Sequence, residues 1–473
     1  MQPNSSSETS LAQFRALMER ENIPALAIDI FSIYYRQYTA GKKYFIEEND
    51  INPLIPEDLI RQDDLQSYTA AGTRAISRCA VIKLNGGLGT TMGLRGPKSL
   101  VPVKNGRTFL DITIAHMKSL QQQSQARLPL LLMNSFYTHH DTLKALTPFY
   151  NDQTSVPIAF LQHRFPRIEK ETSGPITCNA NPAAQWSPPG HGDLYCTLIT
   201  TGLLNQLVAS GIDFAFISNI DNCGATLDTT LLGYMAAESI PFLMEVIERT
   251  PRDNKGGHLA KLKQGGLILR EQSQCPPHEL PAFSDISRYS AFNTNNIWVN
   301  LVVLKKLLST HDGRLPLPLI VNNKTVETDQ GPTAIVQLES AVGAAIVHFP
   351  EARLVQVNPD RFAPVKTCSD LLRVWSDCYK LSGDFRIIPS VPGTKPVRLS
   401  LDERYYSTIA HLQEYFPHGA PSLRTCSALT ITGKVAFGRN VTLRGTVTLR
   451  NNSTDCYTIA DNTTYTDQDI VLS

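Results

Sequence analysis

The 473-residue chain lacks the hallmarks of several protein classes. Its nine cysteines are odd in number and show no C-x-x-C spacing, which argues against a disulfide framework and a zinc site and favours a reducing compartment. No apolar run is long enough to cross a bilayer, and residues 1–10 contain neither a cation nor an apolar core, so we expect no membrane span and no secretory signal. The net charge of only +1 argues against a nucleic-acid partner. These absences predict a cytoplasmic protein.

The rest of the composition is that of a globular protein. Hydrophobic residues make up 42% of the chain and charged residues 18%. Near the N-terminus, apolar residues at helical spacing predict an amphipathic helix, and a second helical stretch runs near residues 26–38. We interpret both as packing elements of an N-terminal helical segment that covers residues 1–78. The stripe of the first helix consists of Leu11, Phe14, Leu17 and Met18.

From Cys79 onward, short apolar runs alternate with helical patterns. This alternation predicts an α/β fold with a mostly parallel sheet and helices on both faces. In such sheets ligands bind beyond the carboxyl ends of the strands. We expect this central domain to span residues 79–384. Its predicted strands are 79–84, 128–133, 158–162, 214–218 and 241–246, and its predicted helices include 109–121 and 197–210.

The C-terminal part has a six-residue rhythm. Prolines cluster near residues 380–400, where we place a boundary, and the last domain would then span residues 385–473. Two registers of period six predict hexapeptide coils of a parallel β-helix. With only about four coils the stack needs capping or a partner, so it is expected to serve packing or self-association, while oligomeric state stays open. The registers are Leu429, Val435, Val441 and Val447, and Ile431, Phe437, Leu443 and Leu449.

The stretch from Val81 to Leu110 has the most distinctive composition in the chain. It reads VIKLNGGLGTTMGLRGPKSLVPVKNGRTFL, a strand followed by a glycine-rich loop, and from Lys83 onward it has five cations and no carboxylate. Glycines let consecutive amides approach an anion, so the stretch predicts a site for several phosphates. Neither known loop motif fits, because Pro97 interrupts a Walker A pattern and Met92 interrupts a dinucleotide fingerprint.

The segment KLNGGLGTTMGLRGPKS resembles the signature of the eukaryotic-type UDP-glucose pyrophosphorylase family. Further stretches follow in the family's order, namely FLQHRFPRI, PPGHGD, SNIDNCGAT and FNTNNIWVNL. The resemblance implies a Rossmann-like, glycosyltransferase-A-like nucleotidyltransferase core with a C-terminal left-handed parallel β-helix. It also implies that UTP and glucose-1-phosphate are converted reversibly into UDP-glucose and diphosphate with Mg²⁺ as cofactor.

Three side chains carry the predicted chemistry. Lys98 follows Gly96-Pro97 and is expected to contact the triphosphate. Asp221 ends a predicted strand, where a carboxylate suits Mg²⁺ or ribose, although an Asx turn would also explain it. Lys366 is expected to bring a second cation to the phosphates. Because the attacking sugar phosphate is already an anion, no general base is required for direct in-line attack.

The resemblance also implies a set of binding residues. Gln162 can donate and accept hydrogen bonds at once, which suits the edge of uracil. The other implied nucleotide contacts are Leu84, Asn85, Gly86, Gly87, Met133, Gly190 and Asn219, and the implied sugar or phosphate contacts are His191, Glu245, Gly257 and Asn296.

Two other functions stay open at this stage. One is a pyrophosphorylase for UDP-N-acetylhexosamines or for a broad set of UDP-sugars, which an assay against a panel of sugar phosphates would separate. The other is a non-catalytic scaffold that binds nucleotide, against which the joint presence of Lys98, Asp221 and Lys366 argues.

Overall fold

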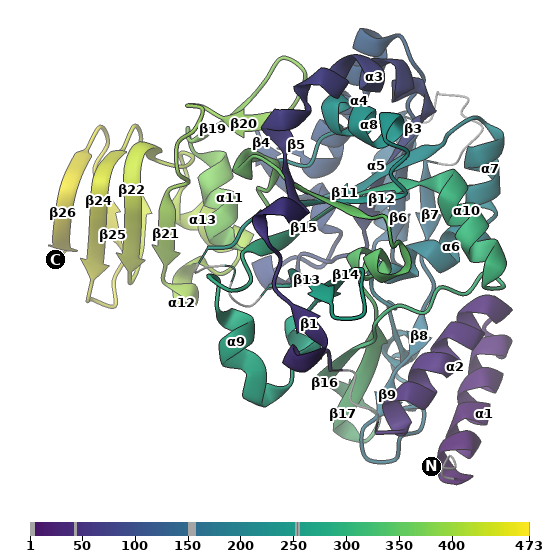
Figure 1. The fold of residues 1–473 in the computed structure, drawn as a ribbon. Coiled ribbons are helices and arrows are strands. Elements are labelled where there is room, and N and C mark those ends of the chain that lie inside the picture. Colours follow the sequence, from purple (N-terminus) through teal and green to yellow (C-terminus); the bar gives the residue numbers. More distant parts are fainter. Residues whose placement is uncertain (1–4, 42–44, 150–157, 251–252, 254–255, 473) are drawn as a thin grey trace.

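The computed structural model describes residues 5–41, 45–149, 158–250, 253 and 256–472. A central sheet flanked by helices occupies the middle of the molecule, two N-terminal helices lie at one side, and the C-terminal strands project at the other (Figure 1). Among these residues, no helix combines the length and hydrophobicity needed to cross a membrane. All nine cysteines are free thiols.

The two predicted N-terminal helices are confirmed as α1 (Ser5–Arg20) and α2 (Ala25–Thr39). Their contact is aromatic, since the rings of Phe14 and Phe31 lie 5.2 Å apart, and Phe31 in turn packs edge-on against Phe165 at 5.3 Å. Such pairs bury large apolar areas and hold the helices to the core.

The segment before Cys79 also contributes strands that the helical prediction missed. β1 (Ile51–Asn52) pairs with β13 (His258–Leu262), and β2 (Leu59–Arg61) pairs in parallel with β18 (Arg353–Gln356). These strands are too short to show a hydrophobic period. They are followed by helix α3 (Thr69–Ala75).

The central sheet is mixed and mostly parallel, as predicted. Its strand order is β2-β18-β12-β15-β11-β3-β6-β7, in which β15 runs antiparallel to both of its neighbours on this path. All seven residues of β3 are buried because helices cover both faces of the sheet. The bounds are β3 (Cys79–Asn85), β6 (Leu130–Asn134), β7 (Ala159–Leu161), β11 (Phe214–Asn219), β12 (Phe242–Glu248), β14 (Leu267–Arg270) and β15 (Ala291–Asn300).

The helical prediction for residues 197–210 needs a correction. The chain forms two helices there, and Gly202 between them has φ +73°, a left-handed conformation that glycine adopts without steric cost and that stops a helix. The helices of the central domain are α4 (Phe109–Ser124), α5 (His139–Leu146), α6 (Leu194–Thr200), α7 (Leu203–Ala209), α8 (Thr229–Ala237), α9 (Leu280–Ser284) and α10 (Leu301–Thr310).

Several small sheets surround the core. Two long antiparallel strands, β16 and β17, extend from the central sheet toward α1 and α2 (Figure 1). Their bounds and those of the short strands are β4 (Pro102–Lys104), β5 (Arg107–Thr108), β8 (Phe165–Pro166), β9 (Ile168–Glu169), β10 (Trp186–Ser187), β16 (Ile320–Thr328), β17 (Gly331–Glu339), β19 (Tyr379–Leu381) and β20 (Ile387–Pro389).

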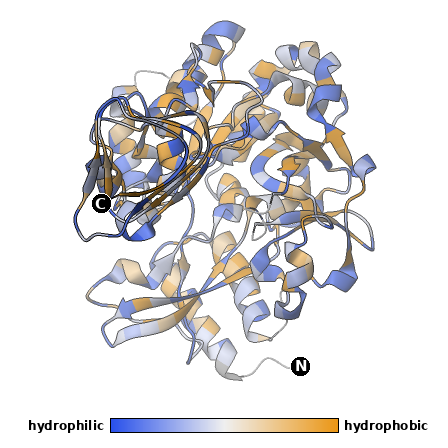
Figure 2. Cartoon of the chain, turned by 90° about the vertical axis from the view of Figure 1, so that its left-hand side faces the viewer, coloured by the Kyte–Doolittle hydropathy of each residue, from blue (hydrophilic) through white to orange (hydrophobic). Residues whose placement is uncertain are grey.

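The C-terminal strands pair in parallel, and all eight residues of the two six-residue registers are buried. In Figure 2, where this part faces the viewer, the strands lie behind one another. Their apolar core extends to α11, which lies before residue 385. The elements are α11 (Cys368–Trp375), β21 (Arg398–Leu401), α12 (Glu403–Tyr406), α13 (Ile409–Tyr415), β22 (Ser422–Thr432), β23 (Val435–Phe437), β24 (Thr442–Asn451), β25 (Tyr457–Ile459) and β26 (Thr464–Leu472).

Candidate active site

The glycine-rich loop leaves the carboxyl end of β3 and folds back on itself. The backbone N–H of Lys98 donates to the carbonyl of Gly87 at 3.1 Å, and that of Gly89 donates to Gly96 at 3.2 Å. A Cβ atom on Gly87 would meet nothing within 4 Å, so this side of the loop is open to a ligand. The loop therefore presents backbone beyond a strand end, as an anion site requires.

Lys98 and Asp221, far apart in the sequence, meet at this loop. The Nζ of Lys98 donates to Oδ2 of Asp221 at 2.5 Å, and the side chains are only 13% and 16% exposed. Asp221 lies in the turn after β11, the strand beside β3, so parallel pairing brings the two loops together. The pairing unites a cation and a carboxylate that the sequence analysis assigned to phosphate and metal.

Lys366 arrives on a third segment that is tied to both loops. The N–H of Val365 donates to the carbonyl of Asp221 at 3.0 Å, and the hydroxyl of Thr91 donates to the carbonyl of Lys366 at 3.3 Å. The lysine itself is exposed. Burial lowers the pKa of His191 and raises the pKa of Glu271, and the charge of Lys366 adds to the first shift and opposes the second. Three loops thus converge on one place.

His191 is a neutral imidazole with a fixed tautomer. Its Nδ1 accepts the backbone N–H of Val342 at 2.9 Å, which places the ring proton on Nε2. Burial, with a further contribution from the charge of Lys366, lowers the pKa of His191 to about 4. Gly190 precedes it at φ +79°, and a Cβ there would lie 2.5 Å from the carbonyl oxygen of Ser340. His191 is therefore uncharged near pH 7, and its Nε2 lies 3.3 Å from the side-chain amide of Asn295.

Glu271 is a candidate that the sequence analysis missed. It follows β14 and lies against Gly257, where a Cβ would come within 2.6 Å of its Oε1. Burial raises the pKa of its carboxyl, and the charge of Lys366 opposes this effect. The signal in the sequence was weak, since a single acid after the apolar run 267–269 forms no motif.

Glu245, for which we predicted a contact with the sugar, lies in a buried hydrogen-bond network. It is fully buried, and its carboxylate accepts hydrogen bonds from Arg361 at 2.6 and 2.8 Å, from Trp298 at 2.9 Å and from Asn296 at 3.0 Å. These donors occupy both oxygens, so the carboxylate supports its neighbours instead of facing a ligand. Arg361 was not anticipated, because nothing in the local sequence marks a buried ion pair.

Asn296 belongs to the same buried network. Its Oδ1 accepts from Asn222 at 3.2 Å, and the Oδ1 of Asn222 in turn accepts the backbone N–H groups of Gly224 and Ala363. Asn222 directly follows Asp221. The network from Glu245 to Asn222 therefore holds the turn that carries Asp221 from behind.

The predicted uridine contacts fall into two groups. Gln162 is 5% exposed, its Nε2 lies against Gly86, and its Oε1 has no hydrogen-bond partner, which leaves one acceptor for a ligand. Met133, in contrast, is 1% exposed within the core, and the side chain of Asn85 donates to Asn134 and Thr142.

Two more nucleotide-side residues contribute main chain to turns. The carbonyl of Leu84 accepts the N–H of Ile220 at 3.2 Å, and the carbonyl of Asn219, which is half-buried, accepts that of Asn222 at 3.3 Å. Leu84 and Met133 have no side-chain group that forms hydrogen bonds. The buried Oδ1 of Asn85, like the Oε1 of Gln162, has no hydrogen-bond partner, and Gly87 leaves its side of the loop open.

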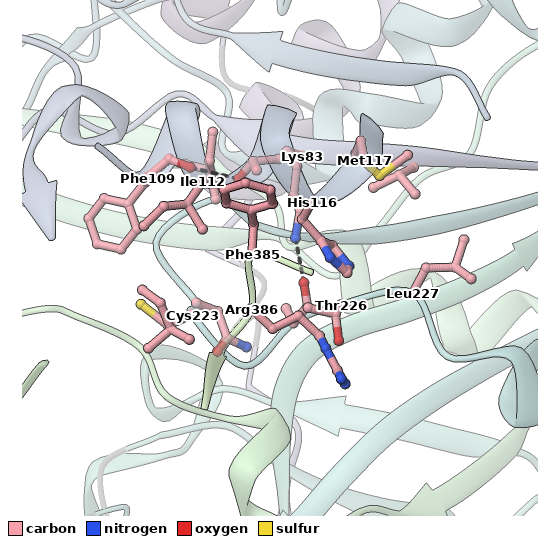
Figure 3. A pocket seen from close by; sticks show the side chains of 16 residues that line it. Lys83, Phe109, Ile112, His116, Met117, Cys223, Thr226, Leu227, Phe385 and Arg386 are labelled. Atoms are coloured by element: carbon pink, nitrogen blue, oxygen red, sulfur yellow. Dashed lines mark hydrogen bonds between the residues drawn. The ribbon is translucent and has the colours of Figure 1, made fainter. Parts of the chain in front are cut away.

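A small cavity lies behind the Asp221 turn (Figure 3). It is lined by α4, by the turn and by Phe385 and Arg386, and its volume of about 40 Å³ has room for a few waters and none for a nucleotide. Lys83 enters it and donates to Ser218 and to the carbonyl of Ala225, which fastens the turn to β3. The cavity therefore lies on the inner side of the turn that carries Asp221.

Fold and site together define an α/β enzyme of the nucleotide-binding class, in which loops at strand ends gather cations around phosphate. A family model described as UTP–glucose-1-phosphate uridylyltransferase matches residues 28–444. The chain belongs to this family, and the predicted resemblance is confirmed.

Known proteins of this family are similar over most of their length. The UTP–glucose-1-phosphate uridylyltransferase of Saccharomyces cerevisiae is 38% identical over 89% of this chain and 83% of its own, and that of Solanum tuberosum is 36% identical over 92% and 90%. A solved variant of UDP-glucose pyrophosphorylase from Leishmania major in complex with UDP-glucose has a TM-score of 0.90 at 37% identity, covering 99% of this chain and 100% of that one. A structure from Trypanosoma brucei has a TM-score of 0.89 at 39% identity, covering 98% and 100%.

Proposed function

We propose that this protein converts UTP and glucose-1-phosphate into UDP-glucose and diphosphate. The observation that carries the proposal is the meeting of Lys98 and Asp221 at the open side of the glycine-rich loop, with Lys366 beside them. Membership of the family and likeness to a UDP-glucose complex support the same substrates.

The reaction would proceed by direct displacement. A phosphate oxygen of glucose-1-phosphate attacks the α-phosphorus of UTP, the bond to the oxygen that bridges to the β-phosphorus breaks, and diphosphate leaves with that electron pair. Lys98 and Lys366 offset the negative charge that gathers on the phosphoryl oxygens. The sugar phosphate is ionised at neutral pH, so no residue has to remove a proton.

Mg²⁺ would be held by Asp221 together with substrate phosphates. Mg²⁺ typically takes one or two protein carboxylates and completes its shell with phosphates and water. The residues fit this pattern, because Asp221 is partly exposed and only its Oδ2 is paired with Lys98. When bound, the ion would supply charge neutralisation of the triphosphate.

Different residues bind the uridine and the sugar of the product. We assign the uridine end to Gln162, Gly86 and Gly87, and the sugar end to His191 and Gly257, with Glu271 added. Gln162 supports this assignment most directly, since its buried Oε1 lacks a partner that an N–H of uracil would supply.

An assay of diphosphate release tests the function. With Mg²⁺ and UTP, we expect glucose-1-phosphate to be turned over with a kcat/KM at least about tenfold higher than N-acetylglucosamine-1-phosphate or galactose-1-phosphate. Equal rates across the panel would instead assign a broad UDP-sugar pyrophosphorylase, and no release with any sugar would leave a non-catalytic scaffold.

Gly257→Ala should weaken sugar binding without unfolding the chain. The new Cβ would lie 2.6 Å from Glu271 Oε1, and Glu271 would have to move. We expect the KM for glucose-1-phosphate to rise by about tenfold, while the KM for UTP stays within about twofold. Steady-state kinetics with each substrate varied in turn measures both.

Gly265→Ala, in the loop between β13 and β14, is the control for the loss of a glycine. A Cβ atom at this position would meet nothing within 4 Å, although its φ of +102° adds backbone strain. A rise in both KM values for Gly257→Ala would contradict the assignment.

We further propose a division into residues 1–78, 79–384 and 385–473, the last a short left-handed parallel β-helix. Its parallel pairing and its buried six-residue registers support this interpretation. The edge strand β26 exposes 61% of Val471, which supports self-association through this part. Light scattering tests the association, and a monomer mass at all concentrations would exclude it.

Cytoplasmic location is supported by the nine free cysteines and is tested by cell fractionation.

A further inference from the structure

Two buried residues connect the segments that carry Gln162 and His191. His163 directly follows Gln162 after the end of β7, and Asp193 follows His191 by two positions in the turn before α6. The two residues are 9% and 5% exposed. The two residues therefore link segments that are thirty residues apart in the sequence.

The contact between them is made by both backbone and side chain. The backbone N–H of His163 donates to Oδ2 of Asp193 at 2.7 Å, and its ring Nδ1–H donates to the same carboxylate at 3.0 Å. The hydroxyl of Thr197 adds a third donor at 2.9 Å. The other ring nitrogen, Nε2, accepts a hydrogen bond from the hydroxyl of Thr200 at 3.0 Å. The ring is therefore fixed at both nitrogens.

This network is complete without a metal ion. His163, Asp193 and Cys196 place three candidate ligand atoms within 4.8 Å of one another. The carboxylate and the ring already have hydrogen-bond partners, and burial raises the pKa of the Cys196 thiol well above its usual range, which disfavours the thiolate that a metal needs. The cluster therefore serves positioning.

Gln162 is held on its other side by the neighbouring strand. It follows a three-residue edge strand, and its backbone N–H donates to the carbonyl of Asn134 at 2.9 Å. Its own side-chain Oε1 has no partner. On the other side, the N–H of Asp193 donates to the carbonyl of Gly190 at 3.2 Å and closes the turn around His191. Asp193 thus touches both segments directly.

We propose that His163 and Asp193 form a clamp that sets the spacing between Gln162 and His191, and so between the uridine and sugar ends of the bound nucleotide sugar. The inference rests on the proposed function for the identity of that ligand. His163 touches neither substrate in this account and is a positioning residue, which acts through Gln162. Its loss should impair binding more than the chemical step.

Kinetics of His163 variants test the clamp. His163→Leu removes the ring Nδ1–H donor and is expected to raise the KM for UTP by about tenfold, with kcat within about threefold. His163→Asn can place a side-chain N–H near the position of Nδ1–H and should recover most of the loss. His116→Leu is the matched control: this histidine is 7% exposed and its Nδ1–H donates to the carbonyl of Asp384, so stability should fall while the KM for UTP does not change.

A double variant separates positioning from a general loss of structure. Because His163 is proposed to act through Gln162, His163→Leu combined with Gln162→Leu should have the KM of Gln162→Leu alone. Fully additive increases would overturn the clamp, and so would an unchanged KM in His163→Leu. If His163→Leu does not fold, Thr200→Val can be used instead, because it removes the hydrogen-bond partner of Nε2. An unchanged KM for UTP in Thr200→Val would also overturn the clamp. Wild-type protein that is inactive with UTP and glucose-1-phosphate would refute the proposed function instead.

Discussion

Lys98→Ala is expected to lower kcat by about a thousandfold while the fold stays intact. Lys98 is the cation that follows the glycine-rich loop, and its ammonium lies 2.5 Å from Asp221, where the phosphates would gather. Its charge would be needed most when diphosphate departs, so the loss should fall mainly on kcat. Stopped or continuous assays of diphosphate release at saturating UTP measure it.

The fold should tolerate this change, because neither side chain of the pair is fully buried. Circular dichroism and the thermal midpoint are expected to stay close to those of the wild type. Lys324→Ala, which removes an exposed lysine from β16, is the matched control and should leave kcat unaltered. A kcat for Lys98→Ala within about tenfold of the wild type would remove Lys98 from the mechanism.

Glu245→Ala is expected to destabilise the protein by about 3–5 kcal/mol, the usual cost of removing one partner of a buried ion pair. Arg361 would keep its charge in the interior, and Trp298 and Asn296 would each lose an acceptor. Urea unfolding, followed by tryptophan fluorescence, measures the change in the free energy of unfolding. Activity should fall as well, because Asn296 is hydrogen-bonded to Asn222 and so supports the turn that carries Asp221.

A surface ion pair provides the contrast for Glu245. Glu8 and Arg36 are bonded on the exposed side of α1 and α2, at 41% and 57% side-chain exposure. Glu8→Ala should therefore leave the unfolding midpoint almost unchanged, since water screens exposed charges. Equal destabilisation by the two substitutions would show that Glu245 and Arg361 contribute no more than a surface pair.

The sequence predicted those parts of the fold that depend on local pattern. β3 and β11 were found because their residues form continuous apolar runs, and the loop after β3 because glycines and cations cluster there. The prediction missed β2 because a strand of three residues is too short to show a hydrophobic period. The break at Gly202 escaped because the apolar spacing continues through it, whereas the backbone turns.

The candidate site was predictable to the extent that its residues follow strand ends. Asp221 and Gln162 do so, and the structure places them beside the glycine-rich loop. The buried network around Glu245 was not predictable, because Glu245 lies within β12, where the face to which a side chain points depends on the neighbouring strands. Arg361 was missed because its partner Glu245 comes from a distant part of the chain, and Glu271 because a single acid after an apolar run forms no motif.

The pairing of β2 with β18 has a consequence for the order in which the protein is made. Leu59 is synthesised early, but the residue opposite it in the sheet is Leu354. A ribosome must therefore complete most of the chain before this edge of the sheet can close, and contacts between such distant residues slow folding. Until then, the growing polypeptide would carry an unpaired edge that is open to wrong partners, which makes the early strand a point where chaperones would be of most use.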